Sequence, residues 1–344
     1  MKLDLDAALI RAMEAGQSVR GTTSPNPPVG AVILDAEGNL VGTGATQPVG
    51  GPHAEVMALQ EAGSSARGGI AVVTLEPCNH TGRTGPCAEA LIAADISQVY
   101  FLHPDPNGVA AGGAQTLRAA GIEVAQIEAP AELPVSDALI PWLTSLRLGR
   151  PHVTLKFAQT LDGFTAASDG TSQWITGEHA REWVHVDRAR RDAIIIGTGT
   201  ALADNPSLTA RFPDGTLREQ QPRRVVIGQR NLEDAGAASS HLRELGYDQF
   251  ANIDDALISL YEAGARDVLV EGGAGLASAF LNAGYVDAVQ AYIAPLLLGE
   301  GRGVLAHPVA QTLQDARRFQ RVGTTVLGDD VLIEYVRRPY VDDE

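Results

Sequence analysis

The sequence predicts an α/β protein built as two domains. Its 344 residues exceed the usual size of a single compact domain. Apolar runs with strand character alternate with helix-periodic segments along the chain, which indicates layered α/β structure. The Gly- and Pro-containing segment at residues 147–151 interrupts this alternation. It predicts a linker between a first domain at residues 1–147 and a second at residues 151–344.

Composition narrows the class of partner. Hydrophobic residues make up 44% of the chain and charged residues 20%, as in ordinary globular proteins. The net charge of −16 disfavours a nucleic-acid binder, because such proteins draw affinity from clustered Lys and Arg. No apolar run approaches the ~20 residues that span a bilayer, and no signal peptide is recognised. We therefore expect small-molecule substrates, no nucleic acid, no membrane and a cytoplasmic location.

The first half begins with a helix and continues as alternating strands and helices. Residues 4–17 place apolar side chains at helical spacing. A proline-rich loop then leads into a strand, a hairpin turn at 35–39 and a returning strand. The expected strands are 31–34, 40–44, 69–75, 98–102 and 122–124, and the later helices are 54–60, 88–94, 114–120 and 131–146.

The segment from His53 to Cys87 carries the strongest chemical signal. Glu55 lies two residues after His53, and Cys78 and Cys87 are the only cysteines in the chain. A histidine, a glutamate two residues on and a later Pro-Cys pair are typical of zinc deaminases, in which His and two Cys bind the metal and Glu transfers protons. One departure is the spacing, since eight residues separate the cysteines and the usual pattern has two.

Helix geometry constrains this motif. In mid-helix, residues i and i+2 point about 200° apart, so His53 and Glu55 converge only if His53 begins the helix, as Pro52 suggests. Three protein ligands leave one position for water, which is the catalytic arrangement of zinc. His80 is the candidate fourth ligand of a structural site, and a disulfide, inert thiols or a capping histidine are the plainer alternatives.

Two loops of the first half are candidate ligand contacts. Asn26 lies between prolines and could present its amide to the edge of a heterocycle, or serve as an ordinary turn residue. Residues 103–108 follow a strand end, where α/β domains tend to place ligand contacts, although a turn without function fits equally.

The second half starts with a strand at 152–158 and ends in a hairpin at 322–327 and 331–336 that closes a mixed sheet. Between them we expect a helix at 178–191 and strands at 193–196 and 267–270. Two Gly-rich turns, at 197–200 and 271–275, could offer N–H groups to a phosphate or be simple geometry. Neither fits G-x-G-x-x-G, because Leu202 and Ser278 replace the last glycine, so a standard Rossmann domain is disfavoured.

Four groups of motifs lie in both halves of the chain: residues 74–78 with 82–87, 155–156 with 161–163, 172–177 and 205–211. Together they resemble the bifunctional deaminase/reductase family of riboflavin biosynthesis, which also separates its cysteines by eight residues. Gly85, Gly108 and Asn205 depart from the family pattern. The resemblance implies a cytidine-deaminase-like three-layer domain followed by a dihydrofolate-reductase-like α/β domain that uses NADPH.

The resemblance implies a hydrolytic deamination in the first domain. A zinc-activated water attacks the amino-bearing carbon of a diaminopyrimidinone that carries a ribosyl 5-phosphate, and Glu55 shuttles the protons. Asn26 would hold the ring. His80 and Arg83, between the cysteines, are the nearest cationic candidates for the phosphate. The implied zinc ligands are His53, Cys78 and Cys87.

The second domain would use NADPH to convert the ribosylamino group to ribitylamino. Lys156 and Asp204 are candidate proton donors for opening the sugar ring, or simple ion-pair partners. By resemblance, the substrate site comprises Ser172, Arg188, Leu208, Arg211 and Glu271. The cofactor site comprises Ala158, Trp174, Thr200, Asp204, Gly273, Ala274, Gly275, Leu276, Ala277, Ser278 and Ala279.

Two alternatives of another kind stay open. The second domain could bind a ligand without reducing it, so that the chain is a deaminase alone. The chain could also act on a base within nucleic acid, which its acidity disfavours. The sequence does not decide between a monomer and a homo-oligomer.

Overall fold

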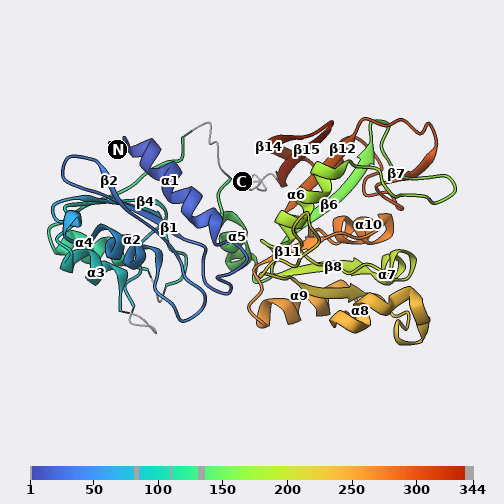
Figure 1. The fold of residues 1–344 in the computed structure, drawn as a ribbon, viewed down its shortest axis with the longest axis horizontal. Helices are drawn as coiled ribbons and strands as arrows, with labels where there is room; N and C mark the ends of the chain where they lie inside the picture. The colour runs from blue at the N-terminus through green and yellow to red at the C-terminus, as the bar shows by residue number, and fades with distance from the viewer. Residues whose placement is uncertain (1, 81–84, 109–110, 131–135, 338–344) are drawn as a thin grey trace. The chain divides into compact units, whose positions relative to one another are not determined.

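The chain folds as two compact units, Met1–Leu148 and Gly149–Glu344, in a computed structural model (Figure 1). The structure describes residues 2–80, 85–108, 111–130 and 136–337. Within these residues no helix is long and apolar enough to cross a membrane. The functional division at 1–147 and 151–344 stays a prediction.

The first unit contains a five-stranded sheet in the order β2-β1-β3-β4-β5. β1 runs antiparallel to β2 and β3, whereas β3, β4 and β5 are parallel. The carboxyl ends of β3 and β4 therefore lie at the same edge of the sheet. The strands are β1 (Gly30–Leu34), β2 (Leu40–Ala45), β3 (Ile70–Leu75), β4 (Gln98–His103) and β5 (Glu123–Gln126).

Helices cover both faces of this sheet and give three layers. α1 (Leu5–Ser18) packs against Val32, Leu34 and Val72 on one face, and the Asp4 carboxylate caps its start by accepting the Ala7 N–H at 2.8 Å. The opposite face packs against α2 (Ala54–Ala62), α3 (Cys87–Ala93) and α4 (Gly113–Ala119). This arrangement agrees with the expected three-layer fold.

Two glycines of β2 bring α2 onto the sheet. A Cβ atom at Gly42 would lie 2.1 Å from the Ala58 carbonyl oxygen, and one at Gly44 would lie 2.1 Å from that of Ala54. Any side chain there would push α2 outward, because real Cβ contacts are never this short. Glycine at both positions therefore lets α2 pack directly against β2.

The predicted elements of the first unit are confirmed to within a few residues, except the last helix. α5 spans Leu139–Leu148, not 131–146. It begins late because Asp137 Oδ1 accepts the Leu139 N–H at 2.9 Å and caps the helix there. It also extends through residues 147 and 148 of the predicted linker. Residues 131–135 lie outside the described part of the chain.

The second unit contains an eight-stranded mixed sheet in the order β10-β9-β8-β11-β6-β12-β15-β14. Strands from β10 to β12 are parallel, and β15 and β14 add an antiparallel hairpin, as predicted. A separate two-stranded sheet pairs β7 (Phe164–Ala167) with β13 (Gly301–Gly303). The main strands are β6 (His152–Thr160), β8 (Ala193–Gly197), β9 (Arg223–Ile227), β10 (Asp248–Phe250), β11 (Asp267–Val270), β12 (Ala288–Ala294), β14 (Phe319–Leu327) and β15 (Asp330–Arg337).

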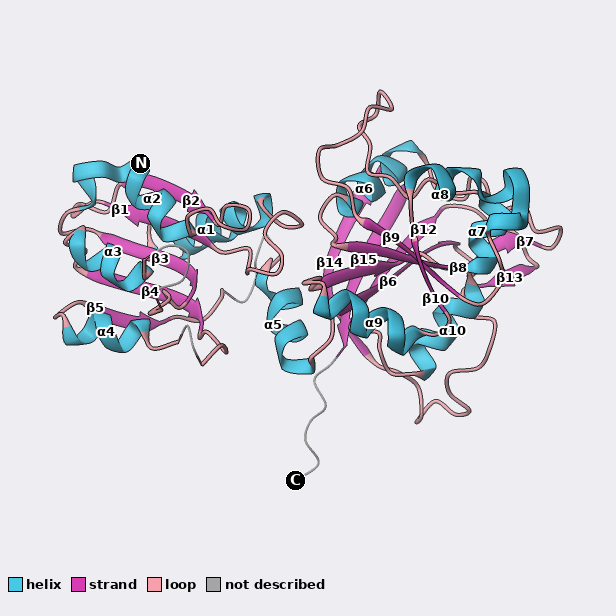
Figure 2. Cartoon of the chain, turned by 90° about the horizontal axis from the view of Figure 1, so that it is seen from below, coloured by secondary structure: helices cyan, strands magenta, loops and turns pink. Residues whose placement is uncertain are grey.

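Helices also flank this sheet on both sides. Figure 2 shows α6 (Glu178–Arg188) on one side and α9 (Ile253–Glu262) and α10 (Ala274–Asn282) on the other. α9 and α10 cover an apolar core that includes Val153, Leu155 and Ile195. α7 (Thr198–Asp204) and α8 (Ser240–Leu245) cover Ile194 and Ile196 on the opposite face. α6 ends at Arg188, three residues before its predicted end at residue 191.

The face beneath α6 carries buried charge. The Arg191 guanidinium is 2% exposed and donates to Asp187 Oδ1 (2.9 Å), Asp267 Oδ1 (2.9 Å) and Thr154 Oγ1 (2.9 Å). Burial lowers the pKa of Arg191, but the Asp187 and Asp267 carboxylates outweigh it and raise the pKa above its ordinary value. Arg191 thus joins the end of α6 to β6 and β11.

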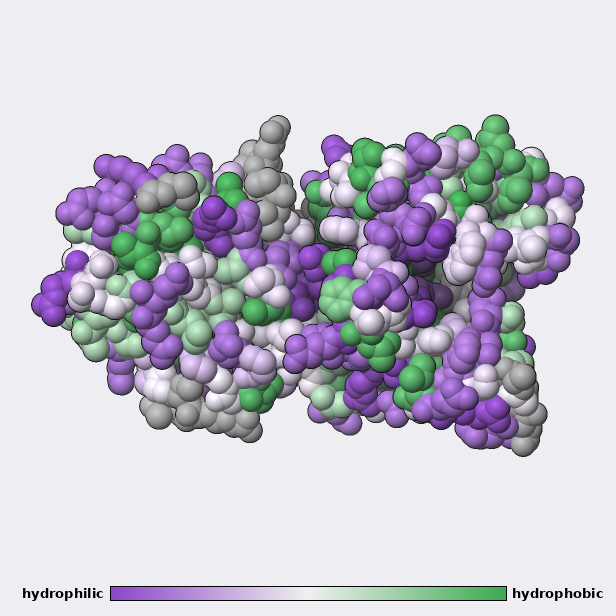
Figure 3. Space-filling view, in the orientation of Figure 1, coloured by the Kyte–Doolittle hydropathy of each residue, from purple (hydrophilic) through white to green (hydrophobic). Residues whose placement is uncertain are grey.

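Apolar side chains gather on the surface of the second unit near β7 (Figure 3). The loop after β6 leads into β7, and its Leu161 is 61% exposed; Leu297, after β12, is 73% exposed. Asp162 Oδ2 accepts the N–H groups of Leu298 (3.0 Å) and Gly299 (2.6 Å) and so holds the two loops together. These loops form a fixed apolar patch on this unit.

Replacing Arg191 by Ala should lower the free energy of unfolding by ~3–5 kcal/mol, because Asp187 and Asp267 would stay buried without their counter-charge. Urea denaturation measures this change. The matched control is Arg223→Ala, since the Arg223–Asp248 pair is 43% and 47% exposed and should contribute about 1 kcal/mol or less. Equal losses in the two variants would show that burial of the Arg191 network does not matter.

Candidate functional site

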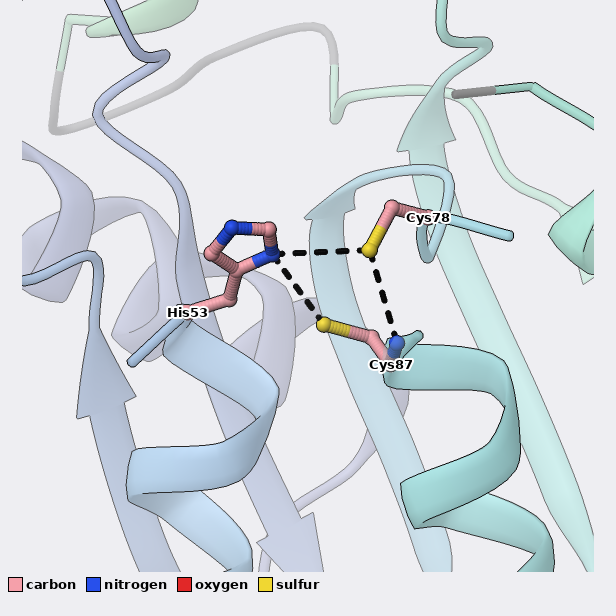
Figure 4. A group of neighbouring side chains, drawn as sticks. All are labelled: His53, Cys78 and Cys87. Carbon is pink, nitrogen blue, oxygen red and sulfur yellow. Dashed lines mark hydrogen bonds between the residues drawn. The ribbon is translucent and has the colours of Figure 1, made fainter. Parts of the chain in front are cut away.

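Three side chains converge in the first unit. His53 Nδ1 lies 3.4 Å from Cys78 Sγ and 3.3 Å from Cys87 Sγ, and both sulfurs point at the imidazole (Figure 4). The three ligand atoms all lie within 4.8 Å of one another. Across the described residues, no other group of three His, Cys, Asp or Glu side chains meets in this way.

Each of these residues stands at the end of a regular element. His53 is the N-cap of α2 with extended backbone (φ −76°, ψ 166°), which confirms that the helix begins there. Cys78 follows β3, and Cys87 is the first residue of α3. The Cys87 N–H donates to Cys78 Sγ at 3.4 Å, and the Ala88 N–H donates to the Cys78 carbonyl at 3.2 Å. These two hydrogen bonds hold Cys78 against the first residues of α3.

The surroundings of the two thiols differ. The Cys87 thiol, the His53 imidazole and the Cys87 N–H lower the pKa of Cys78, against the opposing effect of burial. The pKa of Cys87 is raised by its hydrogen bond to Cys78 and by burial. Cys78 therefore loses its proton more readily than Cys87. One imidazole nitrogen and two sulfurs are a donor set that suits zinc.

Glu55 lies in the first turn of α2 and is 4% exposed. Burial, followed by the charge of Cys78, raises the pKa of its carboxyl to about 7. A carboxyl with a pKa near neutrality can both accept and return a proton. The predicted proton shuttle is therefore buried beside the candidate ligands.

Asn26 and His80, two other predicted residues of the first unit, lie in loops and are half-buried. Asn26 is half-buried in a turn, where its N–H donates to the Thr23 carbonyl at 2.9 Å. His80 is half-buried, and its Nδ1 atom has no hydrogen-bond partner among the described residues. Arg83 lies outside the described residues. No described contact joins Asn26 or His80 to the three converging side chains.

Asp105 lies near the candidate metal ligands, although the sequence did not single it out as a functional residue. Burial raises the pKa of its carboxyl, with smaller contributions from the charges of Glu76 and Cys78, while His80 opposes the rise. Asp105 therefore lies within electrostatic reach of Cys78 and His80. The sequence signal was only its position after β4, in the loop at 103–108.

A second group of predicted residues meets beneath α6. Arg188 donates to Glu271 Oε1 at 2.7 Å and to Oε2 at 2.9 Å, and Lys156 Nζ lies 3.8 Å from Oε2. Burial alone would raise the pKa of Glu271, but Arg188 and then Lys156 lower it to about 2. Burial lowers the pKa of Lys156, and Glu271 partly offsets that effect. The structure thus brings together Lys156, Arg188 and Glu271.

The segment at 208–211 lies against α6. The Thr209 carbonyl accepts from Arg188 (3.1 Å) and from His185 Nδ1 (2.9 Å), a histidine that the sequence did not single out. Leu208 is 3% exposed within the apolar core and has φ +50°, so only its backbone is available to a ligand. The Nε atom of Arg211 is buried without a described partner.

Some of the remaining predicted residues of the second unit are buried or bonded within the protein, and the others are exposed or half-buried. Thr200 Oγ1 accepts the Gly273 N–H at 3.1 Å, which joins α7 to the start of α10. Ser278 is buried and its Oγ accepts the N–H groups of Ala306 and His307, so it fastens a loop; Ala277 is buried as well. The ring of Trp174 lies 4.8 Å from the Arg181 guanidinium. The other predicted residues are exposed or half-buried: Ala158, Ser172, Trp174, Asp204, Ala274, Gly275, Leu276 and Ala279.

Two protein-family models match this chain. The cytidine and deoxycytidylate deaminase zinc-binding region matches residues 4–103, and the RibD C-terminal domain matches residues 151–333. The first match contains His53 and Cys78. The second contains Lys156, Arg188 and Glu271.

Relatives cover nearly the whole chain. The riboflavin biosynthesis protein RibD of Corynebacterium ammoniagenes is 68% identical over 91% of this chain and 92% of the relative. The proteins of the same name from Mycobacterium tuberculosis and Escherichia coli are 46% and 38% identical, over 97% and 95% of this chain and 98% of each relative.

Solved structures agree with these matches. A diaminohydroxyphosphoribosylaminopyrimidine deaminase/5-amino-6-(5-phosphoribosylamino)uracil reductase from Thermotoga maritima is 32% identical, with a TM-score of 0.84, over 96% of this chain and 98% of that one. Acinetobacter baumannii RibD is 34% identical, with a TM-score of 0.80 over the same shares. The converging His-Cys-Cys group, the two family matches and these full-length relatives place the chain in the RibD family of bifunctional riboflavin-biosynthesis deaminase/reductases.

Proposed function

We propose that this chain catalyses two steps of riboflavin biosynthesis: deamination of a diaminohydroxyphosphoribosylaminopyrimidine and reduction of 5-amino-6-(5-phosphoribosylamino)uracil. The convergence of His53, Cys78 and Cys87 beside buried Glu55 is the observation that carries the first step. The family to which the chain belongs carries the second.

In the first step, His53, Cys78 and Cys87 would hold zinc through one nitrogen and two sulfurs. When bound, zinc is a Lewis acid that activates water as the nucleophile. The carbon that bears the amino group gains an oxygen and loses ammonia. Glu55 would transfer the first proton of the water to the ring nitrogen and the second to the leaving amino group. Asn26 would orient the ring, and His80 and Arg83 would contact the phosphate.

In the second step, a bound NADPH would supply hydride to the anomeric carbon. The bond from that carbon to the ring oxygen breaks, so the oxygen needs a proton. Lys156 is the proposed donor, since its ammonium lies 3.8 Å from the buried carboxylate of Glu271, and Asp204 is the second candidate. Arg188 holds Glu271 through both oxygens and so fixes the partner of Lys156. Thr200 and the turn at 273–279 would line the cofactor site, with Ala158 and Trp174.

The alternative of a second domain that binds without reducing predicts ammonia release with no consumption of NADPH. The alternative of a nucleic-acid substrate is disfavoured by the net charge of −16. Assembly as a homo-oligomer and a cytoplasmic location stay predictions.

Glu55→Gln should lower the rate of ammonia release by at least ~10²-fold, because the amide keeps the shape of the side chain but cannot carry the proton. Zinc content, measured by elemental mass spectrometry, should equal that of the wild type. A variant that kept more than about a hundredth of the activity would exclude Glu55 as the shuttle.

Cys78→Ser and Cys87→Ser should each lower both zinc content and ammonia release, since a hydroxyl is a far weaker ligand than a thiolate. Glu55→Gln is the matched control, because it alters the same pocket without touching a proposed ligand. Full zinc occupancy in both serine variants would contradict the ligand assignment.

Loss of one activity should spare the other. Glu55→Gln should still oxidise NADPH when given the already deaminated ribosylaminouracil phosphate, because no proposed reductase residue lies in the first unit. Lys156→Met should release ammonia normally and stop before reduction. If folded Glu55→Gln failed to reduce the deaminated substrate, a single composite site would have to replace the proposal.

A further inference from the structure

Lys156 is an unusual residue in this chain. Of 26 Lys and Arg residues, only Lys2 and Lys156 are lysine. Lys2 is exposed, whereas the Lys156 side chain is 18% exposed and lies in the layer beneath α6. Apart from the contact between His152 and Asp267, the other buried ion pairs of the described residues use arginine: Arg150–Asp287, Arg188–Glu271, Arg191–Asp187 and Arg191–Asp267.

The choice of lysine has a chemical meaning. An arginine keeps its proton at any pH a protein meets, whereas a buried lysine can release one. An ion pair that only stabilised the fold could use arginine, as its neighbours do. A lysine at position 156 therefore points to a proton that must be available for transfer.

The surroundings of Lys156 determine whether that proton is kept at neutral pH. Burial and the positive charge of Arg188 on α6 disfavour the ammonium form, whereas Glu271, just after β11, and Asp187 on α6 favour it. Glu271 is already bound by Arg188 through both oxygens, and its Oε2 lies 3.8 Å from Lys156 Nζ. The carboxylate is thus shared between two cations.

The remaining neighbour is an aromatic ring. Lys156 Nζ lies 5.3 Å from the centroid of the Tyr292 ring, over its face. Tyr292 belongs to β12, next to β6 in the sheet, and is 1% exposed. Ala180, Val184 and Leu332 pack against it, so the ring cannot turn away. An aromatic face attracts a cation more strongly where water is excluded.

The hydroxyl group of Tyr292 does not explain the residue. It is buried, and the described residues offer it no hydrogen-bond partner. Asp187, Glu271, Arg191 and Glu334 are the charged groups around it, and burial with the net effect of these charges keeps it protonated by raising its pKa. Among the residues that the structure describes, the polar group that contacts this side chain is the Lys156 ammonium, over the face of the ring.

We propose that Tyr292 is a positioning residue of the reductase site, whose ring face holds the Lys156 side chain in place as an ammonium that can donate a proton to the substrate. The inference rests on the proposed function, because it takes Lys156 as the proton donor. It adds a residue that acts through Lys156 rather than by touching the substrate.

The test follows the Lys156 ammonium directly. Protein that contains lysine labelled with ¹³C at Cε should give two resonances, and Lys2→Arg should remove that of Lys2 and assign the other. The chemical shift of Lys156 against pH then gives its titration midpoint. Replacing Tyr292 by Leu removes the ring, so the midpoint should fall by about one pH unit, which corresponds to about 1.4 kcal/mol of lost cation–π attraction. Tyr292→Phe keeps the ring and should keep the midpoint.

Two further variants separate the ring from its packing. Pentafluorophenylalanine at position 292 keeps the shape but removes the negative ring face, so the midpoint should fall without a cavity, even if Tyr292→Leu does not fold. Tyr261→Leu is the matched control: it removes another ring that carries a cation, that of Arg266 at 4.3 Å, and should leave Lys156 unchanged.

An unchanged Lys156 midpoint in the fluorinated variant would overturn the inference, as would an equal fall in Tyr292→Phe. The rate of NADPH oxidation on the deaminated substrate provides the link to function. Its decline at high pH should move to lower pH together with the Lys156 midpoint. If the midpoint moved and the rate profile did not, Tyr292 would still hold the ammonium, and Lys156 would be excluded as the proton donor.

Discussion

The position at which α2 begins determines the chemistry of the first unit. Gly42 and Gly44 let α2 pack directly against β2, and the helix begins after His53. With extended backbone at that residue, the imidazole faces the two thiols while Glu55 stays buried in the first turn. A helix that began one turn earlier would turn His53 and Glu55 apart. The packing of a helix on a strand thus fixes the distance between a ligand and a proton carrier.

In the second unit, buried charged groups hold α6 in place. Carboxylates are buried beneath α6, where an unpaired one would be costly, and each is paired with a cation. Arg191 joins Asp187 to Asp267 near the start of β11, and Arg188 binds Glu271 just after its end. The helix is therefore fastened at both ends of one short strand. Lys156 is the member of this layer that we propose as a proton donor, so the layer would serve a reaction as well as the fold.

The sequence predicted most of the fold because the relevant signals are local. Apolar periodicity located α1, strand runs located β1, β3 and β4, and Pro52 with the spacing of His53 and Glu55 placed the start of α2. Errors arose where a side chain ended an element without a periodic signal. Asp137 delays α5, and α6 stops at Arg188 although its helical pattern continues.

The candidate sites divide in the same way. The His-Cys-Cys group was predictable because a histidine, a glutamate two residues later and a Pro-Cys pair occur in the order typical of zinc deaminases. Asp105 and Tyr292 were not, since their importance comes from neighbours distant in sequence: Cys78 and His80 for one, and Lys156 on the adjacent strand for the other. The resemblance assigns Ser278 to the cofactor site, which stays a prediction; the structure adds that its hydroxyl accepts from two backbone N–H groups of a distant loop.

The central claim is that one chain deaminates its substrate and then reduces the product. It is tested most directly by incubating the purified protein with the diaminopyrimidine ribosyl phosphate, with and without NADPH, and weighing the products by mass spectrometry. Without NADPH, the account predicts a product in which oxygen replaces the amino nitrogen. With NADPH, it predicts a product with two more hydrogens on the sugar-derived chain. An unreduced product in the presence of NADPH, with ammonia released normally, would contradict the account.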